Sequence, residues 1–315
     1  MKVSIISPAY NEEENIPFLV EEFIKFKENN NLNDWELIIV DDGSSDKTYE
    51  KAIELSKNRN DILVVKLPYN KGKTDAIKEG FKFSKGEIII IFDADLQFSF
   101  EDAYRIAKKI EDENWDLVAG YKVGKYEKRF VSFVYNFLSR IFFNVKVKDM
   151  NALKGMKRIV LESIPLRKEW HRYIIPIAHH YKFKITEIPV KLYPRRAGIS
   201  KYRGKLRILI GFMDLLAVKF LLTFKEKPLL LFGTIGFLFL LIGFLIGLLA
   251  IILRFVFDLG YRPLAYLVIL FVLSGLLLIS MGFIAELIAY YEENKKWLKK
   301  LLMNFQKSYL FYKGV

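Results

Sequence analysis

The sequence has 315 residues, 52% of them apolar, which is enough for one α/β domain of ordinary size and a smaller additional part. The absence of cysteine excludes disulfide bonds and thiolate metal sites. A formal net charge of +13 suits either nucleic acid or anionic lipid headgroups as a partner, so the placement of the basic residues has to decide between them.

From residue 1 to about 120, short apolar segments rich in β-branched residues alternate with longer amphipathic stretches. This alternation is typical of βαβ units, in which helices cover both faces of a parallel sheet. We therefore predict an α/β fold with a mainly parallel sheet. The predicted strands are Val3 to Ser7, Glu36 to Val40, Ile62 to Lys66, Ile88 to Phe92 and Leu117 to Ala119.

Three of the predicted strands are followed by polar segments with unusual chemistry. These segments are Pro8 to Glu12, Asp41 to Asp46 and Asp93 to Gln97. In open α/β sheets, ligands bind beyond the carboxyl ends of the strands. We therefore expect the binding site at this edge of the sheet.

Asp93 and Asp95 lie directly after a predicted buried strand. Two aspartates one residue apart, in irregular backbone past a strand end, can both bind a hard divalent cation, which takes oxygen ligands and bridges a diphosphate. Mg²⁺ or Mn²⁺ is therefore the expected cofactor. The alternative is that the pair caps a helix beginning near Ser99.

The segment Asp41 to Asp46 follows a second predicted strand. Gly43 permits a tight turn and Ser45 can cap the next helix, but the segment has more acids than a cap requires. Asp42 is well placed to accept hydrogen bonds from a nucleobase or a ribose. Neither a Gly-x-Gly-x-x-Gly nor a Walker pattern occurs, so dinucleotide-dependent oxidoreductases and kinases lose their main support.

The periodicity weakens between about 121 and 200, where we expect elements on the acceptor side of the site. The three histidines, His171, His179 and His180, are interpreted as structural residues and are not included in the site. Residues 203–227 are predicted to form an amphipathic helix that lies in a membrane interface, because a narrow polar stripe interrupts an otherwise apolar surface.

Two apolar segments, about 229–253 and 264–288, are each long enough to cross a hydrocarbon core of ~30 Å, which predicts two transmembrane helices within 228–291. Gly243 and Gly247 form a small-residue step for helix packing, within one chain or between chains. The link between the helices has few charges, whereas Lys182 to Arg207 and the tail 292–315 are strongly basic.

This charge distribution favours a lipid bilayer over nucleic acid as the partner of the basic residues. By the positive-inside rule, we expect a two-helix protein of the cell membrane with the link outside. The domain 1–202, the basic tail and both termini are then cytosolic. The strand-like start of the chain, which has no cleavable signal pattern, agrees with this expectation.

Taken together, these motifs resemble glycosyltransferase family 2, which has the GT-A fold. The matching segments are Pro8 to Glu12, Val40 to Asp46, Asn70 to Lys73 before Ala76 and Gly80, and Asp93 to Gln97. The segment Arg195 to Lys201 is similar to an Arg-x-x-Gly-x-Ser-Lys motif of the dolichol-phosphate mannose synthase and polyprenyl-phosphate glycosyltransferase branch. The resemblance covers roughly residues 1 to 205, and the two-helix part is similar to that of bacterial polyprenyl-phosphate glucosyltransferases. It implies a Rossmann-like mixed sheet, mainly parallel, followed by an interfacial helix and a transmembrane hairpin.

The resemblance also implies roles for individual residues. The nucleotide sugar would be bound by Pro8, Tyr10, Glu12, Asp41, Asp42, Lys73, Asp93 and Ala94. The metal would be bound by Asp93, Asp95 and Gln97, and the acceptor phosphate by Arg129, Lys154, Arg195 and Lys201. The catalytic residues would be Asp95, Asp149, Arg129, Arg195 and Lys201. Lys154 stands where the branch usually has an arginine, and a lysine cannot reproduce a bidentate guanidinium contact.

The implied reaction is transfer of one hexosyl group from GDP-mannose or UDP-glucose to polyprenyl or dolichyl phosphate, with inversion. A lipid monophosphate has a second pKa of about 6, so its oxygen is largely anionic near pH 7 and needs little proton abstraction. Stabilising the departing nucleoside diphosphate is the harder task, and it suits a metal on Asp95. Asp149 is a candidate for shaping the reacting site.

Other functions stay open at this point. One is a family 2 enzyme that builds a glycolipid or a polysaccharide. Another is a non-enzymatic membrane scaffold that binds anionic lipids, or a partner of a lipid flippase, although such a protein needs no carboxylate pair at strand ends. A homo-oligomer is compatible with the sequence.

Overall fold

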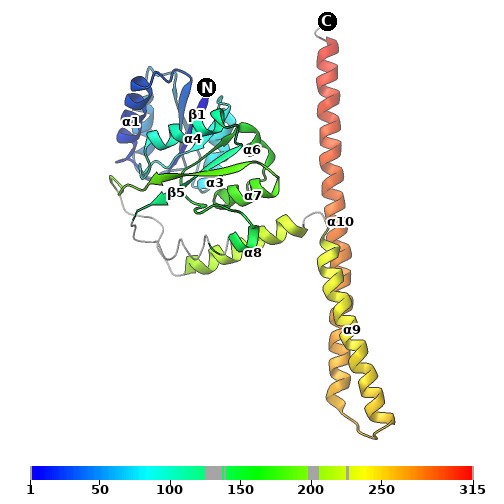
Figure 1. Cartoon of the computed structure of the whole chain (residues 1–315). Helices are drawn as coiled ribbons and strands as arrows, with labels where there is room; N and C mark the ends of the chain where they lie inside the picture. Colours follow the sequence, from blue (N-terminus) through cyan, green and yellow to red (C-terminus); the bar gives the residue numbers. More distant parts are fainter. Residues whose placement is uncertain (1, 125–136, 138–139, 198–205, 225–226, 314–315) are drawn as a thin grey trace. The chain divides into compact units, whose positions relative to one another are not determined.

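The computed structural model describes residues 2–124, 137, 140–197, 206–224 and 227–313. The chain divides into two compact units, one ending at Leu215 and the other beginning at Leu216. The boundary falls inside helix α8 (Leu206–Phe224). The first unit contains a β-sheet, and the second contains two long apolar helices (Figure 1).

The first unit is built around a mixed sheet of seven strands in the order β3-β2-β1-β4-β6-β5-β7. Neighbouring strands are parallel except at β6, which is antiparallel to both β4 and β5. The predicted α/β fold with a mainly parallel sheet is therefore confirmed. The strands are β1 (Val3–Ala9), β2 (Trp35–Asp41), β3 (Ile62–Lys66), β4 (Ile88–Ile91), β5 (Leu117–Val123), β6 (Lys154–Lys157) and β7 (Ile185–Lys191).

Helices cover both faces of this sheet because successive side chains of a strand point to opposite faces. Val3 and Ile5 of β1 are buried in one core with residues of α1 and α4. Ile6 points to the opposite face, where it packs closely against Gly80 of α3. A Cβ added at Gly80 would lie 2.7 Å from the Ile6 Cγ2 atom. The remaining elements of the first unit are α1 (Ile16–Asn29), α2 (Thr48–Ser56), α3 (Lys73–Phe83), α4 (Phe100–Asp112), α6 (Arg158–Ser163), η1 (Trp170–Tyr173) and α7 (Ile174–His180).

One edge of the sheet collects the carboxyl ends of β1, β2 and β4. In the parallel pairs, Ala9 lies opposite Asp41, and Ile6 lies opposite Ile91. Strand β6 runs in the other direction, so its first residue, Lys154, pairs with Ile91 at the same edge. The segments that follow β1, β2 and β4 therefore meet the segment that precedes β6.

The second unit contains α9 (Pro228–Phe255) and α10 (Arg262–Lys313). Residues Pro228–Phe255 and Arg262–Lys295 are long and apolar enough to cross a membrane. Residues 292–313 continue α10 as a helix, so the predicted basic tail is not a separate element. Its cytosolic position and the interfacial position of residues 203–227 stay predictions.

Small residues bring α9 and α10 together. A Cβ at Gly236 would lie 2.7 Å from the carbonyl oxygen of Gly275, and a Cβ at Gly275 would lie 2.8 Å from that of Gly236. Gly243 also packs within the chain, against Phe271 and Val272, whereas a Cβ at Gly247 would make only ordinary contacts at 3.7 Å. The backbones of the hairpin thus approach most closely at Gly236 and Gly275.

The helix pair is also joined by a polar contact at the start of α9. The backbone N–H of Leu229 donates to Glu286 Oε2 at 3.1 Å. A helix leaves its first N–H groups without partners inside the helix, and a carboxylate there satisfies one of them and complements the helix dipole.

Gly275→Ala is expected to destabilise the hairpin, because its methyl group would force the two backbones apart. Gly247→Ala is the matched control, since its methyl group fits in ordinary van der Waals contact. The thermal unfolding midpoint of the detergent-solubilised protein should fall for Gly275→Ala and stay within about 1 °C of the native value for Gly247→Ala, in line with the small effects of substitutions that disturb no packing. Equal midpoints for the two variants would contradict this packing.

Candidate active site

The segment after β2 is held against the loop before α3. Asp42 is buried, and its two carboxylate oxygens accept the N–H groups of Lys71 and Gly72 at 2.8 and 2.9 Å. Burial raises the pKa of Asp42, and the two N–H donors oppose that rise. Gly43 is needed beside it, because it has φ +67° and an added Cβ would lie 2.4 Å from the backbone carbon of Tyr69. Asp42 therefore fixes the shape of this loop.

Asp41 has one oxygen without a protein partner. Its side chain is fully buried, and Oδ1 accepts the N–H of Ser44 at 3.2 Å. Oδ2 has no hydrogen-bond partner among the described residues. A buried carboxylate oxygen without a donor is costly, so it is suited to accept a hydrogen bond from a ligand or a water.

The segment after β1 lies beside these aspartates. Pro8 pairs with Val40 in the sheet, which places Tyr10 and Glu12 just beyond the strand end. The N–H of Glu12 donates to Thr48 Oγ1 at 2.8 Å, and Glu12 Oε2 accepts from Asn15 at 2.6 Å. The predicted nucleotide-binding residues of this segment are thus brought next to Asp41 and Asp42.

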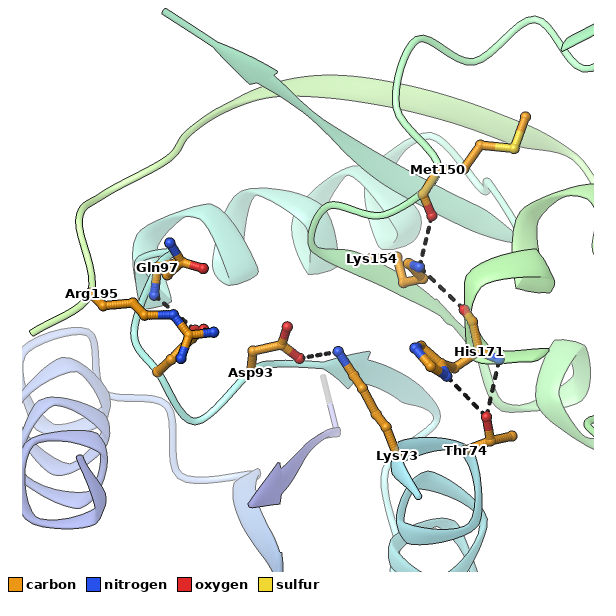
Figure 2. Close-up of polar contacts among 9 residues, drawn as sticks. Lys73, Thr74, Asp93, Gln97, Met150, Lys154, His171 and Arg195 are labelled. Carbon is orange, nitrogen blue, oxygen red and sulfur yellow. Dashed lines mark hydrogen bonds and ion pairs between the residues drawn. The ribbon is translucent and has the colours of Figure 1, made fainter. Parts of the chain in front are cut away.

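Asp93 and Asp95 follow β4, and each pairs with a cationic side chain. Figure 2 shows the pair of Asp93 with Lys73. Asp93 Oδ1 lies 2.5 Å from Lys73 Nζ, and Asp95 Oδ2 lies 2.8 Å from the Arg195 guanidinium. Asp95 Oδ1 accepts the N–H of Gln97 at 3.3 Å, across a turn in which the residue between them has φ +54°. Ala94 is buried between the two aspartates, so their side chains stay at the rim.

The two carboxylates differ in their pKa values. Burial, followed by the neighbouring charge of Asp93, raises the pKa of Asp95 to about 6, and Arg195 opposes that rise. Burial also acts to raise the pKa of Asp93, but the charge and hydrogen bond of Lys73, together with the charges of Lys154 and Arg195, outweigh it and lower this pKa below its usual value. The repulsion between these two neighbouring carboxylates is reduced because each forms an ion pair with its own cation.

The donor set fits a divalent cation that arrives with a diphosphate. Among the residues that the structure describes, no group of three His, Asp or Glu side chains could hold a metal by itself. Mg²⁺ is usually bound through one or two carboxylates together with substrate phosphates, and Asp93 and Asp95 supply such a pair. Gln97 lies beside them, and its side-chain amide donates to the Tyr193 carbonyl at 3.5 Å.

The side chain of Lys154 is buried, and its ammonium binds backbone carbonyls. Its ammonium donates to the carbonyls of Met150 and His171 at 3.0 and 3.5 Å. Burial, followed by the nearby charge of Lys73, lowers the pKa of Lys154 to about 7. Its predicted contact with the acceptor phosphate stays a prediction, and it would require the ammonium to leave one of these carbonyls.

Asp149 lies in the segment before β6 and is also buried. Its Oδ1 accepts the N–H of Asn151 at 2.9 Å, and its Oδ2 forms an ion pair with Lys122 at 3.4 Å. The predicted acceptor residues Arg129 and Lys201 lie outside the described residues. Of the predicted acceptor and catalytic set, the structure therefore places Asp95, Asp149, Lys154 and Arg195.

His171, which the sequence analysis did not include in the site, lies close to the start of α3 in the structure. It is only 7% exposed, and its Nδ1 lies 2.9 Å from Thr74 Oγ1 at the start of α3. Figure 2 shows its ring pointing toward Lys73 and Asp93. Thr74 is 97 residues away in the sequence, so no local pattern could have identified the pair.

The chain is similar to known glycosyltransferases. The glycosyl transferase family 2 model matches residues 4–157. The chain is 30% identical over 314 residues to a dodecaprenyl-phosphate galacturonate synthase of Rhizobium johnstonii, covering 93% of this chain and 90% of the relative. It is 30% identical over 297 residues to an undecaprenyl-phosphate 4-deoxy-4-formamido-L-arabinose transferase of Photorhabdus laumondii, covering 91% and 88%.

Solved structures share the fold. Glucosyl-3-phosphoglycerate synthase from Mycobacterium tuberculosis, in complex with Mn²⁺, UDP-glucose and phosphoglyceric acid, gives a TM-score of 0.54 at 19% identity, covering 70% of this chain and 79% of that chain. At this identity the likeness establishes the fold alone.

Arg195→Gln is expected to tighten Mn²⁺ binding in the absence of nucleotide, because the guanidinium competes with the metal for Asp95. The gain should be on the order of tenfold, the factor that corresponds to about 1.4 kcal/mol. Arg196→Gln is the matched control, since Arg196 pairs with Glu22 instead. Mn²⁺ titration followed by electron paramagnetic resonance measures both, and equal affinities for the two variants would show that Arg195 does not compete.

Proposed function

The chain belongs to glycosyl transferase family 2, and we propose that it transfers one glycosyl group from a nucleotide-diphosphate sugar to a polyprenyl phosphate, with inversion, at the cytosolic face of a membrane. Its relatives are polyprenyl-phosphate glycosyltransferases. GDP-mannose and UDP-glucose are candidate donors. Because one relative is named a galacturonate synthase, we add UDP-galacturonate as a third candidate. Dolichyl and undecaprenyl phosphates are the candidate acceptors.

The observation that carries this proposal is the extent of the similarity to enzymes named for polyprenyl phosphates. It covers 91–93% of this chain, far more than the residues 4–157 matched by the family model. Similarity of this extent includes much of the second unit, with its two apolar helices. A polyprenyl acceptor keeps its tail in lipid, which suits an enzyme that is itself anchored there.

The donor would be held at the edge of the sheet after β1, β2 and β4. Asp41, whose Oδ2 is buried without a partner, is suited to accept from the nucleobase or ribose. Asp93, Asp95 and Gln97 would hold Mg²⁺ or Mn²⁺, which supplies positive charge to the departing diphosphate when bound. A bound Mn²⁺ ion and UDP occur together in the distant mycobacterial synthase, in keeping with such a cofactor.

The reaction would be an in-line displacement at the anomeric carbon. An oxygen of the lipid phosphate, already anionic near pH 7, forms the new bond to that carbon. The bond from the anomeric carbon to the diphosphate oxygen breaks, and its electron pair leaves with the nucleoside diphosphate. Because the attack is from the face opposite the leaving group, the configuration inverts.

Cationic side chains would orient the acceptor phosphate. Arg195, together with Arg129 and Lys201, is proposed for this role. Arg195 pairs with Asp95 at 2.8 Å in the structure, so its contact with the acceptor requires that pair to open. Asp149 is buried and paired with Lys122, which suits a role in shaping the site better than proton abstraction.

Transfer of labelled sugar tests the proposal directly. The full chain is incubated with GDP-mannose, UDP-glucose or UDP-galacturonate, with dolichyl or undecaprenyl phosphate, and with Mn²⁺ or EDTA. We expect a metal-dependent, organic-extractable and acid-labile product with one donor. Asp95→Ala should lower its rate roughly a hundredfold or more, as for loss of a group that stabilises transition-state charge.

Asp112→Ala is the matched control for that assay, because Asp112 is an exposed acid at the end of α4. It should leave the transfer rate unchanged. Binding of nucleotide sugars without a lipid product from any pair of substrates would refute the polyprenyl-phosphate acceptor and favour a family 2 enzyme with another acceptor. Binding of anionic lipid without binding of any nucleotide would favour a membrane scaffold.

The orientation in the membrane can be tested because the natural chain has no cysteine. Asp258→Cys places a single thiol in the link between α9 and α10, and Lys57→Cys places one on the exposed surface of the first unit. A membrane-impermeant maleimide should label Asp258→Cys in intact cells and Lys57→Cys only after permeabilisation. The opposite pattern would contradict the cytosolic position of the catalytic unit.

A further inference from the structure

His171 is held in place through both its backbone and its ring. Its backbone N–H donates to Thr74 Oγ1 at 3.3 Å, and its Nδ1 lies 2.9 Å from the same oxygen. Its carbonyl accepts from the buried ammonium of Lys154 at 3.5 Å. The ring of His171 is thus held by the first turn of α3, and its backbone carbonyl by the first residue of β6.

The contacts of Thr74 favour one tautomer of the His171 ring. Thr74 Oγ1 accepts the backbone N–H of His171, and the hydroxyl proton has Nδ1 as its only acceptor among the described residues. Burial, together with the charges of Lys73, Arg172 and Lys154, lowers the pKa of His171 well below its usual value. The ring is therefore neutral at pH 7, and we assign its one proton to Nε2, which leaves Nδ1 to accept from the Thr74 hydroxyl.

The Nε2–H group is available to a ligand. It has no hydrogen-bond partner among the described residues, and it is not one of the fully buried side-chain atoms that lack a partner, so it is not sealed off from solvent. In Figure 2 the ring points toward the Lys73–Asp93 pair, and Arg195 lies on the opposite side of that pair. The donor thus faces the region next to the carboxylate pair.

The charge around His171 indicates which part of a nucleotide sugar it suits. Lys73, and a metal held by Asp93 and Asp95, would already provide for a diphosphate. A neutral N–H in a cationic surrounding matches an uncharged oxygen, such as a sugar hydroxyl, which needs a donor but no further positive charge. Sites that bond a substrate hydroxyl also reject analogues that lack it.

We propose that the Nε2–H of His171 donates a hydrogen bond to an oxygen of the transferred sugar and so positions that sugar beside Asp93. The inference rests on the proposed function, because it requires a nucleotide sugar at Asp93 and Asp95. Thr74 is a positioning residue that holds the ring with Nε2–H toward the sugar. Lys154 supports the same segment through the His171 carbonyl.

The test compares binding of a nucleotide sugar with binding of its nucleoside diphosphate. Calorimetric titrations of the full chain with Mn²⁺ use UDP, UDP-glucose and UDP-galacturonate, and GDP with GDP-mannose. The sugar increment is the ratio of the Kd for the nucleoside diphosphate to the Kd for the nucleotide sugar. The loss of one hydrogen bond should lower this ratio roughly fivefold to tenfold in His171→Leu, while the Kd for the nucleoside diphosphate stays within about twofold.

Three further variants keep the test independent of folding. His171→Gln retains a neutral N–H donor near the position of Nε2 and should restore most of the sugar increment. Thr74→Val leaves the ring but removes its orienting hydroxyl, so it should lower the increment by a smaller factor than His171→Leu. His180→Leu is the control, since His180 is exposed, and it should bind like the native chain.

The outcomes separate this inference from the proposed function. An unchanged sugar increment in His171→Leu, or an equal loss of affinity for nucleoside diphosphate and nucleotide sugar, would overturn the role of His171 alone. Binding of nucleotide sugars by the native chain without transfer to any polyprenyl phosphate would refute the proposed acceptor. In that case a lowered increment in His171→Leu, restored in His171→Gln, would still support the sugar contact.

Discussion

The structure depends on the compensation of negative charge at one edge of a sheet. Parallel strands β1, β2 and β4 end there and antiparallel β6 begins there, so the chain brings five aspartates together: Asp41, Asp42, Asp93, Asp95 and Asp149. Carboxylates this close in a partly buried site repel one another unless donors or cations face them. Backbone N–H groups satisfy Asp42, and Lys73, Arg195 and Lys122 face Asp93, Asp95 and Asp149, whereas Asp41 keeps one buried oxygen without a partner among the described residues.

That compensation explains how the site can serve a diphosphate. Asp93 and Asp95 are already matched by Lys73 and Arg195, so a divalent cation alone would add uncompensated positive charge. In the proposed reaction the nucleoside diphosphate would bring negative charge together with the metal, and Arg195 would then be released for the acceptor. The same balance leaves the neutral His171 as the donor that can approach a sugar without adding charge.

Local sequence patterns predicted the first half of the fold and the acidic strand ends. The regular alternation of apolar strands and amphipathic helices up to β5 made the parallel sheet predictable. Strand β6 was not predicted, because its sequence Lys-Gly-Met-Lys has no clear apolar pattern. Its glycine, Gly155, leaves room for a side chain of α4, which is distant in the sequence. A Cβ there would lie 2.5 Å from Ile106 of α4. His171 and the burial of Lys154 likewise depend on tertiary contacts, with Thr74 and Met150.

The central claim is that metal and diphosphate replace the Arg195 contact of Asp95. A structure of the full chain with Mn²⁺ and the nucleoside diphosphate of its donor, with manganese located by anomalous scattering, tests it most directly. We expect Mn²⁺ bound to Asp95 and the diphosphate, with the Arg195 guanidinium no longer paired with that carboxylate. Mn²⁺ and diphosphate bound away from Asp95, with the Arg195–Asp95 pair intact, would contradict the account.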